Sequence, residues 1–371
     1  MADYTLYTAK ITTLTPLHIG NGRDLLNEYD YAIQGGQTWR IDEAALLEAQ
    51  NVADPRQAEM LARTPPRQLL QEPDFRPDSP LFRYVIRGTP RATGAGAQVR
   101  EQLKDIHDRP YLPGSSLKGA LRTVLAWNLW AAHSLTPDPA RLNRRREWAA
   151  QEYERQLFGR DPNHDLLRAL QVGDSAPLDA SRLMLMNARV IGRGGHLGSP
   201  IELEAIRQET TLTLRLKIDR WLLAVRGSDA LGTPGDGRWL EQLPQAVAAY
   251  NADRWQAEQA WFARIPGADR LAGFYGKLHG LRLKPNAFIV QVGWGAGWDG
   301  KTLGSRLKGT PAFMERIIDD YRLARGSRKA GDPFPKSRRV AVSLQPAADG
   351  TRAETPAAPL GWVAVELEAA G

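Results

Sequence analysis

The stretch TLTLRLKID at residues 211–219 constrains the fold more than any other part of the sequence. Four apolar residues alternate there with threonine, arginine and lysine, which is typical of a strand with one buried and one polar face. Further strand patterns lie at residues 4–14, 181–191, 287–292, 340–345 and 362–368, and helical patterns at 42–72, 116–134, 139–158, 239–264 and from there to about 280. Because strands and helices mix without a regular strand–helix repeat, the sequence predicts an α+β fold rather than a doubly wound sheet.

The composition is that of an ordinary globular protein. The 371 residues are 42% hydrophobic, and a chain of this length can form two domains. No apolar run approaches the length of a membrane span, and the start MADYTLYTAK has no signal pattern, so we expect a cytoplasmic protein without membrane contact. Cysteine is absent and the six histidines have no ligand spacing, so we expect neither a metal nor a cofactor.

The net charge of +7 is concentrated near the C-terminal end of the sequence. Between Lys301 and Val340, eleven lysines and arginines face only four acids, while the rest of the chain is balanced. A localised basic patch favours a polyanionic partner such as nucleic acid. The alternative is a solvated basic loop that binds nothing.

A glycine-rich loop, GWGAGWDGKT, occupies residues 293–302 and contains the phosphate-loop pattern from Gly295 to Thr302. A strand pattern precedes it, but glycines and Pro311 interrupt the segment after Lys301, and a convincing helix pattern begins only at about residue 312. The helix N-terminus that would hold a nucleotide phosphate is therefore missing at the required place. ATP or GTP hydrolysis through Gly295–Thr302 stays an alternative function.

A second glycine-containing segment, YLPGSSLKGALRT, predicts a turn followed by a helix. Gly114 would lie in the turn, Ser115 or Ser116 would cap the helix, and Lys118 and Arg122 would share one helix face. Free backbone N–H groups, the helix dipole and two cations predict a site for the phosphates of a polymer backbone. A well-capped amphipathic helix with solvated basic side chains is the alternative.

Five motifs follow one another along the whole chain. They are TLTPLHIGNG (13–22), YLPGSSLKGALRT (111–123), LQVGDS (170–175), VGWGAGWDGKT (292–302) and FPKSRR (334–339). This ordered series resembles the motifs of the RAMP proteins of type III CRISPR effector complexes, and it is most similar to those of the head subunit of the type III-A (Csm) complex. The GSSLKGALR block is the most specific of the five.

The resemblance implies an RNA-recognition-motif-like (ferredoxin-like) RAMP core with a helical insertion in residues 1–225, and a helical segment with a second, degenerate domain of the same kind in residues 226–371. It implies a non-catalytic RNA-binding subunit that caps the filament of backbone subunits, holds the 3′ part of the CRISPR guide RNA (crRNA), and contributes to guide maturation and antiviral defence. The implied partners are crRNA, target RNA, the backbone RAMP subunits and host nucleases that mature the guide.

The resemblance also assigns candidate RNA contacts. They are His18, Gly20, Arg23, Gly114, Ser115, Ser116, Lys118, Arg122, Gly293, Gly295, Gly297, Lys301, Arg306 and Lys308. The glycines would permit close approach of the RNA backbone, with Lys301 as a point charge. Trp294 and Trp298 would either stack on bases or simply pack in the protein. For His18 the alternative is an ordinary, satisfied histidine at the end of a strand.

A catalytic alternative rests on Asp30 in NEYDYAI, near the position of an aspartate that the family's slicing backbone subunit needs for target RNA cleavage. Asp30 would then place a metal or a water for in-line attack by the RNA 2′-hydroxyl. However, about 90 residues separate HIGNG from GSSLKG in this chain. The backbone subunit keeps these motifs far closer, so the long insertion favours the head subunit, which is not known as the slicer.

Three other segments have simpler interpretations. Asp174 and Ser175 are expected to stabilise a turn at the end of a strand. Arg144–Arg146 are expected to lie on the solvated face of a helix. The loop at residues 88–100, with two arginines and no acid, is a candidate for contact with the guide–target duplex, because proteins that follow A-form RNA read its backbone and shape.

Overall fold

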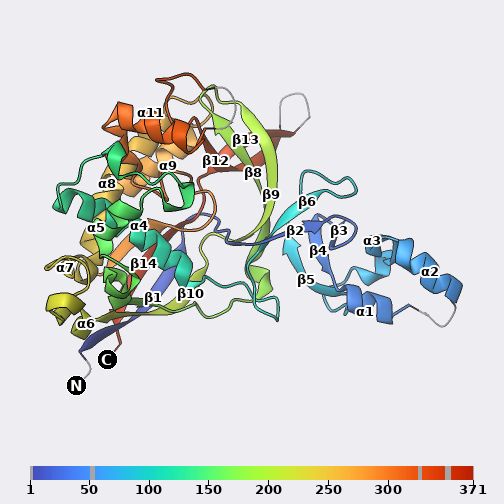
Figure 1. Ribbon diagram of the computed structural model, residues 1–371. Coiled ribbons are helices and arrows are strands. Elements are labelled where there is room, and N and C mark those ends of the chain that lie inside the picture. Colours follow the sequence, from blue (N-terminus) through green and yellow to red (C-terminus); the bar gives the residue numbers. More distant parts are fainter. Residues whose placement is uncertain (1–2, 51–54, 325–327, 347–351, 371) are drawn as a thin grey trace.

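The computed structural model describes residues 3–50, 55–324, 328–346 and 352–370. A five-stranded antiparallel sheet, in the order β11–β14–β1–β10–β7, forms the centre of the larger part of the molecule (Figure 1). Its strands are β1 (Tyr4–Thr13), β7 (Leu170–Val172), β10 (Thr211–Asp219), β11 (Ala287–Gln291) and β14 (Trp362–Ala369).

One face of this sheet is covered by the two long helices α4 (Gly114–Ala132) and α8 (Leu243–Phe262). The alternating apolar residues of β10 are all buried against them, as the sequence pattern predicts. Asn128 on α4 donates a hydrogen bond to the carbonyl oxygen of Ala246 on α8 at 3.0 Å, which joins the helices to each other. The α+β class is thus confirmed.

Elements of this sheet follow the ferredoxin-like order of strand, helix, strand, strand, helix, strand: β1, α4, β7, β10, α8 and β14. The last strand, β14, lies between β11 and β1 and pairs antiparallel with both. Strands on both sides of the predicted domain boundary at residues 225 and 226 therefore share one sheet. The boundary itself stays a prediction.

A second, nine-stranded sheet is built around the long hairpin of β8 (Leu183–Gly192) and β9 (Leu197–Ile206). Figure 1 shows this hairpin running between the helical body and a smaller lobe. Its other strands are β2 (Gly20–Leu26), β3 (Tyr31–Gln34), β4 (Gln37–Ile41), β5 (Phe82–Arg87), β6 (Gln98–Gln102), β12 (Ser337–Pro346) and β13 (Arg352–Ala358).

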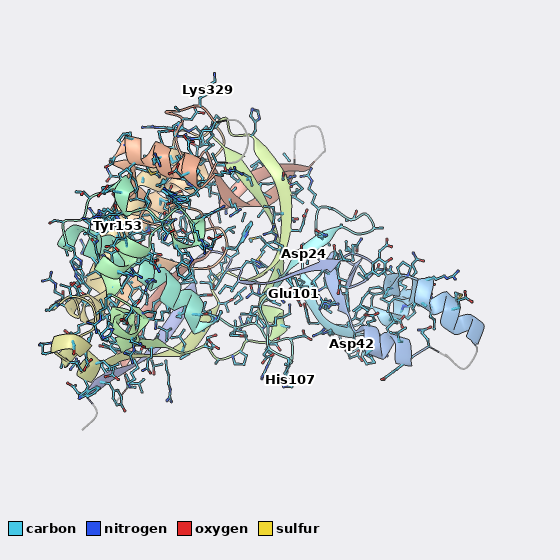
Figure 2. The ribbon with its side chains drawn as sticks, in the orientation of Figure 1. Asp24, Asp42, Glu101, His107, Tyr153 and Lys329 are labelled. Carbon is cyan, nitrogen blue, oxygen red and sulfur yellow. The ribbon has the colours of Figure 1, made fainter. Side chains whose placement is uncertain are left out.

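The smaller lobe contains β2 to β6 and three short helices, α1 (Glu43–Glu48), α2 (Pro55–Arg63) and α3 (Pro66–Leu69). Asp24 and Asp42 lie in this lobe, whereas Tyr153 and Lys329 lie in the helical body (Figure 2). The remaining helices of the body are α5 (Gln151–Phe158), α6 (Arg220–Ala224), α7 (Arg238–Glu241), α9 (Asp269–Gly280), α10 (Gly304–Lys308) and α11 (Pro311–Asp320). In the described ranges, no helix has the length and apolar composition needed to cross a bilayer.

The continuous helix expected over residues 139–158 is wrong, because only α5 is α-helical there. Short 3₁₀ turns occupy Pro139–Arg141 and Arg146–Trp148. Between them the side chain of Asn143 accepts a hydrogen bond from the N–H of Arg145 at 2.9 Å, and such local bonds compete with helix formation. Arg144–Arg146 are therefore exposed, as expected, but do not share a face of an α-helix.

Candidate nucleic-acid interface

The glycine-rich loop that follows β11 is pressed against distant parts of the chain. Gly293, Gly295 and Gly297 all have positive φ, at +77°, +99° and +68°. A Cβ atom on Gly293 would lie 2.5 Å from the carbonyl oxygen of His18, and one on Gly295 would lie 2.7 Å from Cβ of Leu360. Glycine at these two positions is therefore required both by backbone conformation and by close packing.

His18, which precedes β2, anchors the loop through its main chain: its carbonyl oxygen accepts the N–H of Trp294 at 2.9 Å. The side chain is only 2% exposed, and its Nδ1 lies 2.6 Å from the carbonyl oxygen of Glu204. That oxygen can only accept, so Nδ1 carries the proton. Burial lowers the pKa of His18 to about 4, against the opposing effect of this hydrogen bond, and the imidazole is neutral near pH 7.

The burial of the His18 side chain affects two of the predicted RNA contacts, His18 and Gly20. The His18 ring is a satisfied interior group, as the structural interpretation of TPLHIG expects, and its contact with RNA stays a prediction. Gly20 lies beside it, and a Cβ there would come within 3.0 Å of Nε2 of His18. The small size of Gly20 thus makes room for the imidazole.

Two arginines flank the indole of Trp294. The guanidinium carbon of Arg100, on β6, lies 5.5 Å from the ring centroid, and that of Arg339, on β12, lies 4.9 Å from it. Both arginines are exposed, and distances of this order allow cation–π attraction. The sequence shows that both arginines belong to basic segments. It does not show that they meet at Trp294, because the three residues lie on three separate parts of the chain.

A cavity of about 550 Å³ lies beside the loop, with Gly295, Gly297 and Trp298 in its wall. Five cations and one carboxylate, Asp299, also line it; the cations are Arg146, Arg328, Lys336, Arg338 and Arg339. Within the described ranges, the N–H groups of Gly295 and Gly297 donate to no protein acceptor. A basic cavity with free backbone donors is suited to phosphate groups.

Many cations of the basic segment between Lys301 and Val340 are already paired inside the protein. Arg338 is bonded to Glu258 at 3.0 Å and to Asp299 at 2.9 Å, and Arg328 to Glu315 at 2.6 Å. The segment is therefore less free to bind a polyanion than its charge alone suggests. Arg325, which belongs to it, lies outside the described residues.

Three of the predicted RNA contacts are cations at the end of the glycine-rich loop or just after it, and their surroundings differ. Lys301 is exposed, and its ammonium group has no partner among the residues that the structure describes. Arg306 stacks on Trp127 at 3.7 Å from the ring centroid, and Lys308 pairs with Asp299 at 2.5 Å. Lys301 is the one of the three that is fully available to a ligand.

The prediction that Ser115 or Ser116 caps α4 is wrong. The helix begins at Gly114, its N-cap is Pro113, and no side chain of the N-cap accepts a hydrogen bond. Instead, Asp174 accepts the N–H of Gly114 at 2.7 Å. A Cβ on Gly114 would lie 2.2 Å from the carbonyl oxygen of Val172, so the glycine lets the start of α4 approach the end of β7.

Two neighbouring contacts show how GSSLKG and LQVGDS depend on each other. Ser175 accepts the N–H of Leu112 at 3.0 Å, so Asp174 and Ser175 hold the start of α4 against the end of β7, and no turn is formed at residues 173–179. Lys118 donates to the carbonyl oxygens of Leu167 and Leu170 at 2.9 and 2.7 Å.

Burial lowers the pKa of Lys118, and its ammonium group faces the protein. Arg122 pairs with Asp165 at 2.9 Å and lies 3.9 Å from the ring centroid of Phe158. The two cations therefore satisfy internal acceptors, and the phosphate site expected at the start of α4 stays a prediction.

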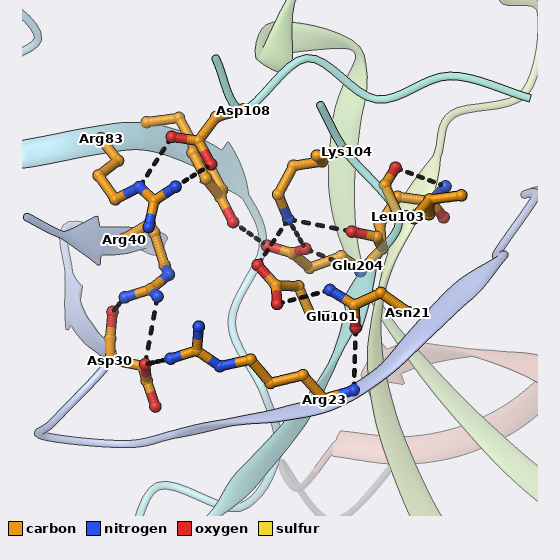
Figure 3. A network of polar contacts seen from close by, with 12 residues as sticks. Asn21, Arg23, Asp30, Arg40, Arg83, Glu101, Leu103, Lys104, Asp108 and Glu204 are labelled. Atoms are coloured by element: carbon orange, nitrogen blue, oxygen red, sulfur yellow. Dashed lines mark hydrogen bonds and ion pairs between the residues drawn. The ribbon is translucent and has the colours of Figure 1, made fainter. Parts of the chain in front are cut away.

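Asp30 is held by a polar network in the lobe (Figure 3). Its carboxylate pairs with Arg23 at 2.7 Å and Arg40 at 3.2 Å, and accepts the N–H of Leu26 at 2.9 Å. No cluster of three or more potential metal-ligating side chains occurs in the described part of the chain. A metal or an activated water at Asp30 would have to displace these partners, and Arg23, a predicted RNA contact, is one of them.

The loop does not have the geometry of a nucleotide phosphate loop. β11 lies at the edge of an antiparallel sheet, whereas a phosphate loop joins a strand directly to a helix that opens at its lysine. The five-residue α10 begins at Gly304, beyond Lys301, and the hydroxyl of Thr302 donates to the carbonyl oxygen of Trp298 at 2.8 Å. These features disfavour hydrolysis of ATP or GTP at Gly295–Thr302.

Comparison with known sequences identifies relatives. The model of the RAMP superfamily matches residues 10–258. Csm5 proteins of two Mycobacterium tuberculosis strains, CDC 1551 and H37Rv, are 29% identical over 221 residues, which cover 55% of this chain and 52% of theirs. The match thus spans about half the length of these relatives. Csm5 of Streptococcus thermophilus is 26% identical over 277 residues, which cover 68% of this chain and 71% of that protein.

Solved structures share the fold. A chain of a cryo-EM structure of a type III-A Csm–crRNA–target RNA ternary complex aligns with a TM-score of 0.75 at 24% identity, covering 97% of this chain and 100% of that chain. The crystal structure of T. onnurineus Csm5 aligns with a TM-score of 0.65 at 21% identity, covering 95% and 99%. The predicted resemblance is thus confirmed, and the chain belongs to the RAMP superfamily, with Csm5 proteins of type III-A systems among its relatives.

Proposed function

We propose that the protein is the RNA-binding subunit that caps the backbone filament of a type III-A (Csm) CRISPR interference complex and holds the 3′ part of the crRNA, without cleaving RNA itself. The basic cavity beside the glycine-rich loop carries the proposal, because it combines free backbone donors with an excess of cations. The relatives named Csm5, and a fold shared with a chain of a Csm–crRNA–target RNA complex, support it.

The arrangement suits RNA whose sequence varies from one guide to the next. Cations and backbone N–H groups contact phosphates without reading bases. Trp294, with Arg100 and Arg339 beside it, adds a flat surface on which any base can stack. Base pairing between guide and target would supply sequence specificity. The roles in guide maturation with host nucleases and in antiviral defence, and the cytoplasmic location, stay predictions.

The proposal is tested by the affinity of the full-length protein, alone and in its complex, for crRNA over a salt series. We expect Arg100→Met and Arg339→Met each to weaken binding and to lower the slope of log affinity against log salt by about one, since each removes about one phosphate contact. Arg270→Met, at an exposed arginine of α9, should leave both quantities unchanged. Absence of salt-sensitive crRNA binding in both states would refute the proposal.

The same complex separates the proposal from cleavage at Asp30. If the subunit is non-catalytic, Asp30→Asn leaves every target RNA cut in place, although it weakens the network with Arg23 and Arg40. Loss of one cut at a regular position, with the complex still assembled, would establish Asp30 as a cleavage residue instead.

A further inference from the structure

A second cavity, of about 490 Å³, opens between α4, α5, α10 and α11. Its walls are rich in aromatic rings, which come from α4, α5, α11, the residue that directly follows α11, and the glycine-rich loop. They are Trp130, Tyr153, Phe158, Trp298, Phe313 and Tyr321. The volume is within the range of pockets for small organic ligands, and we refer to it as the aromatic cavity.

The aromatic cavity adjoins the basic cavity. Trp298, Arg146 and Leu323 line both, so the indole of Trp298 stands in the wall between them. Phe334 holds this indole edge to face, with ring centroids 5.2 Å apart. A chain that lies across the glycine-rich loop therefore reaches the aromatic cavity by passing the wall that Trp298, Arg146 and Leu323 share.

Cations surround the aromatic cavity. Arg122, Arg146 and Lys301 line it together with a single acid, Glu154. Lys301 and Arg146 are exposed, and neither side chain has a partner among the described residues. An apolar, aromatic interior with a cationic margin matches a ligand with a flat apolar body and an anionic attachment, which is the chemistry of a nucleotide.

We propose that the aromatic cavity receives an unpaired base of the guide RNA, adjacent to the nucleotides whose phosphates lie on the glycine-rich loop. This inference rests on the proposed function. Stacking on aromatic rings accepts any base, so the cavity fixes the position of the strand rather than its sequence. Lys301 and Arg146 bind the two phosphates that flank the inserted base. The base must leave the guide–target duplex, so this nucleotide marks where pairing stops.

The direct test uses crRNA in which 2-aminopurine replaces one base at a time along the 3′ part, bound to the full-length protein and to the complex. We expect fluorescence quenching at one or two adjacent positions, because stacking on aromatic rings quenches this base. At the same position an abasic nucleotide should weaken binding about tenfold, the scale of one lost stacking contact.

Filling the cavity provides a matched pair of variants. Ala149 lines the cavity at a helix end with φ −47° and ψ −45°, and Ala149→Phe should abolish the quenching and remove the difference between intact and abasic RNA. Ala263 is exposed at the end of α8 with φ −61° and ψ −19°, and Ala263→Phe should change neither. Lys301→Met should weaken binding several-fold, whereas Lys329→Met, at an exposed lysine outside both cavities, should not.

Two outcomes would overturn the inference. The first is equal affinity of the wild-type protein for intact and abasic RNA at every position, which needs no variant and so does not depend on the folding of Ala149→Phe. The second is failure of Ala149→Phe to enter the complex while its RNA binding is unchanged, which would assign the cavity to an apolar segment of a partner protein. In either case, if Arg100→Met and Arg339→Met still weaken crRNA binding, the proposed function is unaffected.

Discussion

Lys104 carries a charge that is almost completely withdrawn from water. Its side chain is 4% exposed, and its ammonium group lies 2.6 Å from Glu204 and 3.3 Å from Glu101. Figure 3 shows these residues within the polar network. Glu204 also accepts the hydroxyl of Tyr84 at 2.7 Å. We expect Lys104→Met to lower the free energy of unfolding by about 3–5 kcal/mol, because it leaves buried carboxylates without their cation. Urea denaturation measures this change.

An exposed ion pair provides the control for Lys104. Arg63 and Glu59 lie 2.8 Å apart on α2, with side chains 79% and 68% exposed. Glu59→Gln should cost about 1 kcal/mol or less, since water already screens this pair. Equal costs for the two variants would show that the interior network is not as dry as the structure indicates.

His18 makes stability depend on pH. Burial lowers its pKa from 6.5 to about 4 in the folded protein, so between these values the unfolded chain binds a proton that the folded chain does not. The stabilising contribution of the neutral imidazole is fully present above about pH 6.5 and is lost as the pH falls toward 4. The total loss is about 3 kcal/mol.

The variant His18→Asn isolates this effect, because asparagine keeps an N–H donor for Glu204 and does not titrate. The free energy of unfolding of the wild type should fall more steeply than that of His18→Asn between pH 6.5 and 4, as measured by denaturant titration at several pH values. Parallel curves would mean that His18 is not buried as a neutral group.

At the scale of elements, two glycines of the glycine-rich loop share a backbone conformation but differ in their surroundings, so their substitutions can be compared. Gly293 and Gly297 have φ of +77° and +68°, but a Cβ would meet the carbonyl oxygen of His18 only at Gly293. Gly297→Ala should cost about 1 kcal/mol from backbone strain alone. Gly293→Ala should cost clearly more and should also weaken crRNA binding, because the loop must move away from His18. Thermal unfolding and RNA affinity together check both statements.

Elements with a strong local pattern could be predicted, and elements that depend on distant partners could not. β10 alternates strictly and α4 has a continuous apolar face, so both are evident from the sequence. β9 contains Gly198 and Pro200, and β13 contains Pro356, residues that disfavour strands, yet both pair with long neighbours.

The candidate site shows the same division. Its glycine-rich loop and basic character are evident from the sequence, because both are local in the chain. The pairing of Arg338 with Glu258, 80 residues away, and the meeting of Arg100 and Arg339 at Trp294 follow only from the tertiary fold.

At the scale of the whole molecule, the shared sheet predicts that the chain does not divide at residue 225. Fragment 1–225 lacks β11 and β14, and fragment 226–371 keeps the β11–β14 pair but lacks β1, the strand that joins this pair to the rest of the sheet. We expect neither fragment alone to resist proteolysis or to unfold cooperatively by circular dichroism, and the two expressed together to do both. An independently folded fragment 1–225 would instead establish the predicted boundary as a true domain boundary.

The place of β14 between β11 and β1 also has a consequence for biosynthesis. Roughly 350 residues separate β1 from β14, so the ribosome needs about 20–70 s to synthesise the chain between them before β14 can pair with β1. Throughout that interval the edge of β1 that will pair with β14 has unpaired backbone N–H and C=O groups, which chaperones and other nascent chains can reach. A product released early by a stop codon or a damaged message lacks the closing strand, so proteases can remove it before it accumulates.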